Sequence, residues 1–221
     1  MKENIFKAVL FDLDGTLLDT LEDLANSMNV ILKNHGMNTF SVEDYKEFLG
    51  FGLEGLIRCV IPDDKVSDEL VDEFLACMRD EYGKRWAEKT RPYPGIPELL
   101  DELQSRGLKL VVLSNKADDF TKIIIENLLP SWEFDIVRGL NDDFPPKPDP
   151  ASAIHIANHL GIDPADFLFL GDTDIDMQTA NAAGMHSVGV LWGFRTADEL
   201  KGNNAKTLIE KPSQLLELLK S

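Results

Sequence analysis

Apolar residues along this chain repeat in two different ways, and the change falls close to residue 88. From residue 18 to residue 88 they recur every three or four positions, which is the spacing of one helix face, and no convincing strand is present. Helices are expected at 21–32, 41–48, 56–61 and 67–86. This region therefore predicts a small bundle of helices.

Beyond the segment Arg91-Pro92-Tyr93-Pro94-Gly95, short apolar runs alternate with amphipathic stretches. Strands are expected at 108–113, 134–137, 167–170, 187–191 and 207–209, and helices at 99–107, 120–129, 151–160 and 177–183. The apolar run at 8–11 adds a strand of the kind that is buried on both faces. Strands that alternate with helices predict a parallel sheet with right-handed crossovers.

The two patterns together predict an α/β fold in two parts. A Rossmann-like parallel sheet core is expected from residues 1–17 and 89–221, interrupted by an all-helical cap domain over residues 18–88. Ligands of such sheets bind at the carboxyl ends of the strands. Because the insert leaves the chain directly after the strand at 8–11, it is expected to hang over that edge as a lid.

Two carboxylates, Asp12 and Asp14, follow this first strand directly, with Gly15 and Thr16 after them. The spacing of two places both carboxylates on the same side of the pleat. Gly15 permits a sharp turn that leaves backbone N–H groups free to face an anion. The stretch predicts a place that holds a metal ion and a phosphate group.

Polar residues also follow two later strands of the predicted sheet. Ser114 and Asn115 come after the strand at 108–113, and Asp172 and Asp176 come after the strand at 167–170. Lys147 lies in a stiff loop between prolines. Taken singly, these residues also suit a helix cap, acidic charges at a helix N-terminus and a solvated lysine. At one edge of one sheet, they predict a single site.

This set of motifs resembles the haloacid dehalogenase superfamily, in its phosphatase branch with a helical cap between the first and second motifs. The matching residues are Asp12-Leu13-Asp14-Gly15-Thr16, Ser114, Lys147 and Gly171-Asp172-Thr173-Asp174-Ile175-Asp176. The flanking residues 177–180, 183–185 and 192–195 are most similar to the phosphoglycolate phosphatases of that superfamily. The resemblance spans the whole chain.

The resemblance implies a chemistry for the first motif. Asp12 would be the nucleophile that forms an aspartyl-phosphate, and Asp14 the general acid and then the general base. Mg²⁺ would be held by Asp12, Asp172 and the backbone carbonyl of Asp14. Asp176 and Thr16 would orient the residues that hold the metal.

The resemblance also implies how the phosphoryl group is bound. Ser114 and the backbone N–H of Asn115 would donate to phosphoryl oxygens, and Lys147 would bring a compact positive charge to them. The expected activity is that of a magnesium-dependent phosphatase acting on a small phosphorylated metabolite, with 2-phosphoglycolate as the suggested substrate. A phosphomutase or phosphotransferase on the same scaffold, and a non-enzymatic phosphate-binding protein, are the alternatives.

Two arginines are candidates for the far end of such a substrate. Arg58 is expected to grip a carboxylate from the cap side, and Arg195 is a weaker candidate; a solvated helix face is the alternative for both. The glycines at positions 50, 52 and 55 match a dinucleotide-binding spacing, but no strand is expected before them. A flexible cap loop that dips toward the substrate is expected instead, with a flexible loop that has no contact to the substrate as the alternative.

Composition narrows the choice of partners and compartment. The net charge of -17 disfavours nucleic acids and anionic membranes, although a divalent cation reverses the field locally and admits a small anion. Two cysteines without metal-ligand spacing and the lack of a signal-peptide pattern favour a reduced, cytoplasmic protein. The sequence makes no prediction of oligomeric state.

Overall fold

The computed structural model describes residues 6–219, so the outermost residues of the predicted core lie outside it. A six-stranded sheet in the order β5-β4-β1-β6-β7-β8 forms the centre, and all its neighbouring pairs are parallel. The strands are β1 (Ala8–Phe11), β4 (Lys109–Ala117), β5 (Ile136–Leu140), β6 (Phe167–Gly171), β7 (His186–Val190) and β8 (Thr207–Ile209). The predicted parallel α/β sheet is confirmed.

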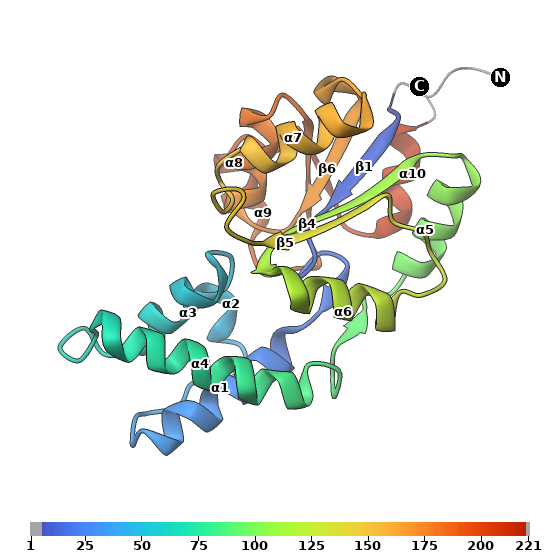
Figure 1. Ribbon diagram of the computed structural model, residues 1–221. Helices are drawn as coiled ribbons and strands as arrows, with labels where there is room; N and C mark the ends of the chain where they lie inside the picture. The colour runs from blue at the N-terminus through green and yellow to red at the C-terminus, as the bar shows by residue number, and fades with distance from the viewer. Residues whose placement is uncertain (1–5, 220–221) are drawn as a thin grey trace.

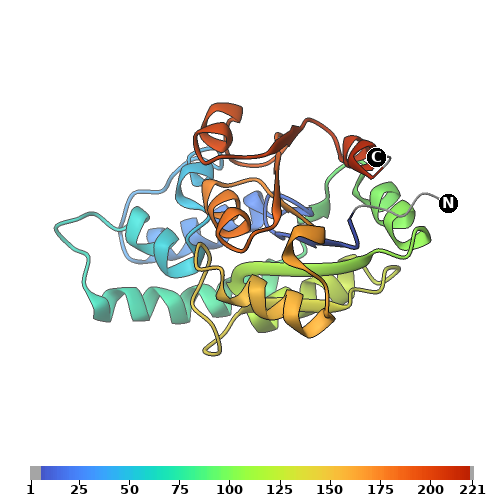
Figure 2. The ribbon, with the colours of Figure 1, turned by 90° about the horizontal axis from the view of Figure 1, so that it is seen from above.

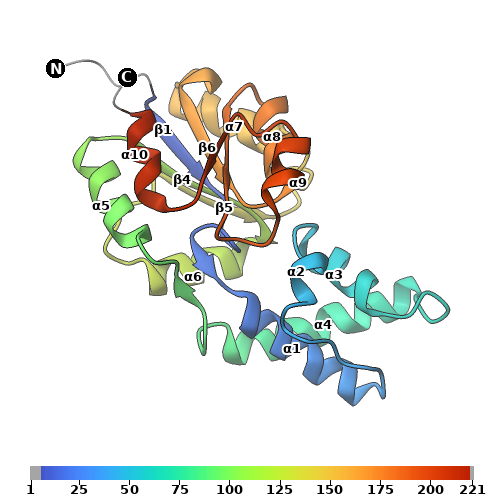
Figure 3. The same ribbon diagram turned by 180° about the vertical axis from the view of Figure 1, so that it is seen from behind.

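Helices cover both faces of this sheet, as the apolar character of its central strands requires. Val9 and Phe11 of β1 belong to the core on one face, whereas Ala8 and Leu10 belong to the core on the other. The first face is covered by α5 (Ile96–Ser105), α6 (Asp118–Leu128) and α10 (Leu215–Leu218), with α5 and α10 visible beside each other in Figure 3. The second is covered by α7 (Ala151–Leu160) and α8 (Asp174–Ala182). A short helix, α9 (Ala197–Gly202), follows β7.

A separate group of helices lies at one end of the sheet (Figures 1 and 2). It consists of α1 (Leu21–Asn34), α2 (Tyr45–Phe48), α3 (Gly52–Val60) and α4 (Asp68–Arg85). The β1 and β6 arrows point toward it in Figure 1, so these helices stand beyond the carboxyl ends of the strands. We call α1–α4 the helical unit.

The two connections between the helical unit and the sheet are tied together. Leu18–Asp19 (β2) pairs with Arg91–Pro92 (β3) in a small antiparallel ribbon. The helical spacing of apolar residues in this region does not predict these two short strands. Asp23 of α1 is fully buried, and its carboxylate accepts hydrogen bonds from the backbone N–H groups of Lys89 and Thr90. A buried carboxylate needs such donors, so Asp23 fixes where the chain returns to the sheet.

Several element boundaries differ from those predicted, including those of β4, β5 and α3. β4 continues through Ser114 to Ala117 instead of ending at residue 113, because pairing with β5 resumes at Ala117 after an irregularity that follows Leu113. β5 starts two residues later than expected. α3 begins at Gly52, so most of the expected glycine loop is the first turn of a helix.

Candidate active site

Three buried carboxylates meet where β1 and β6 end. Asp12 directly follows β1, Asp172 directly follows β6, and Asp176 lies in the first turn of α8. One carboxylate oxygen from each lies within 4.8 Å of the others, and Asp172 and Asp176 are completely shielded from solvent. So many negative charges in one buried place require positive charge close by.

Glycines make room for these carboxylates. A Cβ on Gly15, which has φ +82°, would collide with the carboxylate of Asp172, as would one on Gly193. A Cβ on Gly171 would collide with Asp176. Glycine is therefore required at these positions so that the backbone can approach the acidic side chains.

Lys147 supplies the positive charge that the protein itself brings. Its Nζ lies 2.8 Å from Asp12 Oδ1 and 2.7 Å from Asp176 Oδ1, and the residue is only 5% exposed. Burial lowers the pKa of Lys147, but the carboxylates of Asp12 and Asp176 raise that pKa by more, so the lysine stays charged. Apart from this contact with Lys147, Asp12 Oδ1 has no hydrogen-bond partner among the described residues.

Asp12 and Asp172 resist ionisation, because their pKa values are raised. Burial raises the pKa of Asp12 to about 7, and the nearby negative charge of Asp176 adds to this, whereas Lys147 opposes it. Burial and the charges of Asp176 and Asp12 raise the pKa of Asp172 well above its usual range. A bound cation would favour the charged forms.

The side chain of Asp172 is held in place from both sides. Thr16 Oγ1 donates a hydrogen bond to Asp172 Oδ1 at 3.1 Å, and the backbone N–H of Phe194 donates to Asp172 Oδ2 at 2.8 Å. Thr16 itself is fixed through its carbonyl oxygen, which accepts a hydrogen bond from the indole of Trp192. These contacts fix the direction in which Asp172 points.

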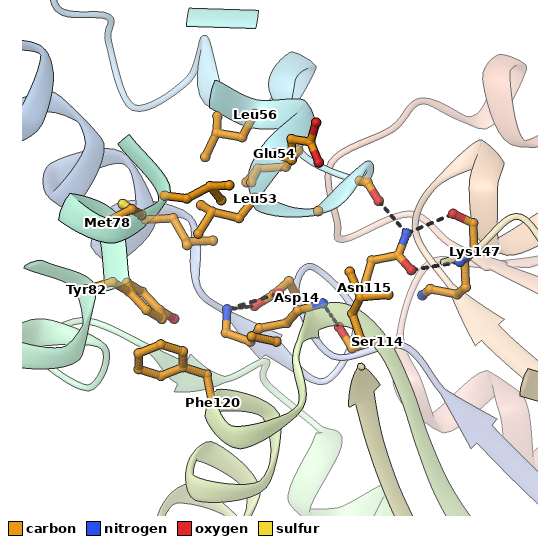
Figure 4. A pocket seen from close by; sticks show the side chains of 18 of the residues that line it. Asp14, Leu53, Glu54, Leu56, Met78, Tyr82, Ser114, Asn115, Phe120 and Lys147 are labelled. Atoms are coloured by element: carbon orange, nitrogen blue, oxygen red, sulfur yellow. Dashed lines mark hydrogen bonds and ion pairs between the residues drawn. The ribbon is translucent and has the colours of Figure 1, made fainter. Parts of the chain in front are cut away.

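Asn115 locks the loop that carries Lys147. Its side-chain oxygen accepts from the backbone N–H of Lys147 at 2.8 Å, and its side-chain nitrogen donates to the carbonyl of Lys147 at 2.9 Å. The same nitrogen lies 3.2 Å from the carbonyl oxygen of Gly50 in the helical unit. Asn115 therefore joins three segments, in addition to lying next to Ser114 at the site, as Figure 4 shows.

Asp14 faces a second buried lysine that the sequence did not single out as a site residue. Lys116 Nζ lies 2.9 Å from Asp14 Oδ1 and 4.7 Å from the ring centroid of Tyr82, which belongs to α4. Burial lowers the pKa of Lys116, but Asp14 and Tyr82 raise it by more. Burial is also the main reason that the pKa of Tyr82 rises to about 12. The contact of Lys116 with the Tyr82 ring joins α4 to the end of β4.

Arg58 is not brought to the site. It lies on an exposed face of α3 and forms ion pairs at 2.9 Å with Glu54 and with Asp68. It is absent from the described residues that line the cavity between the helical unit and the sheet, whereas Glu54 is among them. The structure thus matches the solvated-face alternative, because a partner four residues away on the same helix already satisfies the guanidinium.

Arg195 joins the core to the helical unit. Its guanidinium donates to the carbonyl oxygens of Lys46 and Leu49, the latter at 2.8 Å, at the end of α2. The side chain is only 7% exposed. Arginine is favoured at the C-terminal end of a helix, where carbonyl oxygens lack partners. Arg195 therefore contacts protein carbonyls in this structure.

Comparison with known proteins places this site in a family. Residues 9–190 match the haloacid dehalogenase-like hydrolase family. A phosphoglycolate phosphatase from Aquifex aeolicus is 33% identical over 213 residues, which is 96% of each chain. A phosphoglycolate phosphatase from Nitrosospira multiformis is 36% identical over 192 residues, covering 85% of this chain and 84% of that one.

Solved structures agree with these relatives. A Lactobacillus delbrueckii protein to which phosphoglycolate phosphatase activity is attributed superimposes with a TM-score of 0.91 at 30% identity, covering 98% of this chain and 99% of its own. A haloacid dehalogenase-like hydrolase from Streptococcus pneumoniae gives 0.85 at 25% identity, covering 96% and 98%.

The chain belongs to the haloacid dehalogenase-like hydrolase family. Within that family it is phosphoglycolate phosphatase-like along nearly its whole length, and the resemblance seen in the sequence is confirmed. None of the helices within residues 6–219 has the length and apolar character needed to cross a membrane.

Proposed function

We propose that this phosphoric monoester hydrolase cleaves a small phosphorylated metabolite in a Mg²⁺-dependent reaction through an aspartyl-phosphate on Asp12. The observation that carries this proposal is the position of Asp12. Its carboxylate lies at the end of β1, 2.8 Å from Lys147 and within a buried cluster of three carboxylates, and it lines the open cavity below the helical unit. A nucleophile in such a place reaches substrate while most of its surroundings exclude water.

The reaction divides between Asp12 and Asp14. A carboxylate oxygen of Asp12 forms a bond to phosphorus while the bond from phosphorus to the ester oxygen breaks, and Asp14 gives its proton to the departing alkoxide. Asp14 then takes a proton from water, whose oxygen attacks phosphorus and releases Asp12. The products are the alcohol and inorganic phosphate. Both side chains line the same cavity, which supports this division.

The donor set suits a hard cation. Asp12, Asp172 and Asp176 offer only oxygen atoms, one oxygen from each lies within 4.8 Å of the others, and glycines leave space for the carboxylates. Asp12, Asp172 and the backbone carbonyl of Asp14 would hold Mg²⁺, with Asp176 and Thr16 orienting them. The bound ion would neutralise negative charge shared by the phosphoryl group and the carboxylates.

Other residues of the core would bind the phosphoryl group. Ser114 and the backbone N–H of Asn115 donate to its oxygens, and Lys147 stabilises the charge that develops on them. Residues 18–88 act as a cap that closes over the substrate and excludes water. The contacts of Arg195 with α2 and of Asn115 with Gly50 support the closed arrangement.

Phosphate release from p-nitrophenyl phosphate and from 2-phosphoglycolate tests this proposal, the second substrate being the one suggested by the names of the relatives. We expect release with Mg²⁺ and none with EDTA. Release that is unaffected by EDTA contradicts the metal dependence. A failure to release phosphate from any ester indicates a phosphate-binding protein, and conversion of a hexose 1-phosphate into an isomeric phosphate indicates a mutase.

Asp172→Asn is expected to weaken Mg²⁺ binding at least about tenfold, because one of three buried charges is lost. Isothermal titration calorimetry without substrate measures this directly. In the parent protein the affinity should increase from pH 6 to pH 8, since the pKa of Asp12 is raised to about 7 and metal binding requires the ionised carboxylate.

Asp174→Asn is the matched control for Asp172→Asn. Asp174 begins the same helix but lies outside the cluster of three carboxylates, so this variant changes the net charge without removing a proposed ligand. Equal Mg²⁺ affinities for the parent and Asp172→Asn would contradict the assignment of Asp172.

A further inference from the structure

The cavity between the helical unit and the sheet has two chemically different parts. Its volume is about 490 Å³, within the usual range for small-molecule sites. The polar part, formed by the core, contains Asp12, Asp14, Ser114 and Lys147. The rest is mainly apolar, and Figure 4 shows Leu53, Leu56 and Met78 of the helical unit on the opposite side from Asp14 and Ser114.

The apolar part is contributed by four different helices. The side chains that carry the argument are Leu24 of α1, Leu53 and Leu56 of α3, Leu75 and Met78 of α4 and Phe120 of α6. Leu53, Leu75 and Phe120 keep part of their surface exposed, whereas Leu56 and Met78 are fully buried and belong to the packed interior that fixes the shape of the wall. A leaving group attached to a phosphate at Asp12 would extend against this wall.

Positive charge in this cavity is already neutralised. Lys147 pairs with Asp12 and Asp176, and Lys116 pairs with Asp14. Arg79 pairs with Asp119, and its guanidinium also lies over the ring of Phe120. Among the described residues, each cation that lines the cavity thus has an acidic partner.

Moving a carboxylate of the leaving group from water into this cavity would therefore cost free energy, because the cavity offers it little positive charge in return. Burying a charge without a partner is costly, whereas burying each methylene against an apolar wall is favourable. A two-carbon group such as glycolate would also leave most of the 490 Å³ unused.

We propose that this cavity selects phosphate monoesters of apolar alcohols, with the hydrocarbon lying against the α3–α4 wall. This inference rests on the proposed phosphatase function and names the substrate class for that site. It predicts that 2-phosphoglycolate is a poor substrate for this chain, even though relatives carry its name.

Linear alkyl phosphates provide the test, because ethyl, butyl and hexyl phosphate have leaving groups of similar reactivity and differ mainly in apolar surface. With the whole protein in saturating Mg²⁺, kcat/KM should rise about three- to fourfold for each added methylene. Hexyl phosphate should exceed 2-phosphoglycolate at least tenfold. The slope of kcat/KM against chain length measures how much each methylene gains from contact with the apolar wall.

Leu53→Ser should flatten this slope, because Leu53 is half-buried in the first turn of α3 and faces the cavity. Ile123→Ser is the matched control: Ile123 is an exposed apolar residue of α6 that does not line the cavity, so this variant should keep the parent slope.

Four results would count against the inference. A flat series in the parent, or hydrolysis of 2-phosphoglycolate as efficient as that of hexyl phosphate, overturns the apolar assignment alone, since phosphate release would still support the proposed function. An unchanged slope in Leu53→Ser overturns the role of this wall. Lack of hydrolysis of any ester, including p-nitrophenyl phosphate, overturns the proposed function and this inference with it.

Discussion

Asp12→Asn is expected to reduce turnover at least about a thousandfold while leaving the fold intact. The amide keeps the shape of the carboxylate, but it is not a nucleophile and it removes one of the three clustered charges. The measurement is phosphate release from p-nitrophenyl phosphate in saturating Mg²⁺. Turnover above a tenth of the parent value would contradict the assignment of Asp12 as the nucleophile.

Thermal unfolding separates this loss of chemistry from a loss of structure. Folding raises the pKa of Asp12 from 3.8 to about 7, so stability from this group is present at low pH and is lost as the pH rises through 7. A neutral amide does not carry that penalty. In EDTA at pH 8, Asp12→Asn should therefore unfold at the same or a higher temperature than the parent. Asp142→Asn, in an exposed loop, serves as the control for a charge change elsewhere.

Much of the core could be predicted because its strands are buried on both faces. Such strands appear in the sequence as continuous apolar runs, and β1 and β6 were expected at almost their observed positions. The polar residues that follow them mark the edge at which a parallel sheet binds its ligands. The site residues could be predicted because they follow directly where the apolar strands end, as Asp12 follows β1 and Asp172 follows β6.

Contacts between charged residues far apart in the sequence leave no such pattern. Lys116 and Asp14 are 102 residues apart, and Arg195 and the carbonyl of Lys46 are 149 residues apart. Periodicity reports which face of an element is buried, but it does not report which distant group meets a charged side chain. The pairs of Lys116 and Arg195 became visible only in the structure.

Arg58 could have been judged better from the sequence. Glu54 precedes it by four residues, and an acidic residue at that spacing is a natural partner on a helix. A loop before residue 56 would leave Glu54 and Arg58 without the fixed spacing of a helix, so the expected loop does not predict this pair. The early start of α3 at Gly52 changes the interpretation.

Lys147→Met is expected to destabilise the protein by about 3–5 kcal/mol at pH 8 in EDTA, because it leaves buried carboxylates without a countercharge. Lys147 Nζ contacts both Asp12 and Asp176, and the pKa values of Asp12 and Asp172 are already raised with the lysine present. Without Lys147 these pKa values rise further. The loss of stability should therefore be smaller at pH 5.5, where protons neutralise the carboxylates, and Mg²⁺ should restore part of it at pH 8.

Lys116→Met is the matched comparison for this variant. Lys116 is also buried, but it pairs with Asp14 alone, whose side chain is 19% exposed and can be hydrated once the lysine is removed. Its loss should show a weaker dependence on pH and little rescue by Mg²⁺. Denaturant unfolding of both variants at the two pH values, with EDTA or Mg²⁺, measures the difference. Equal destabilisation of Lys147→Met at pH 5.5 and pH 8 would show that Lys147 does not hold the acidic cluster together by its charge.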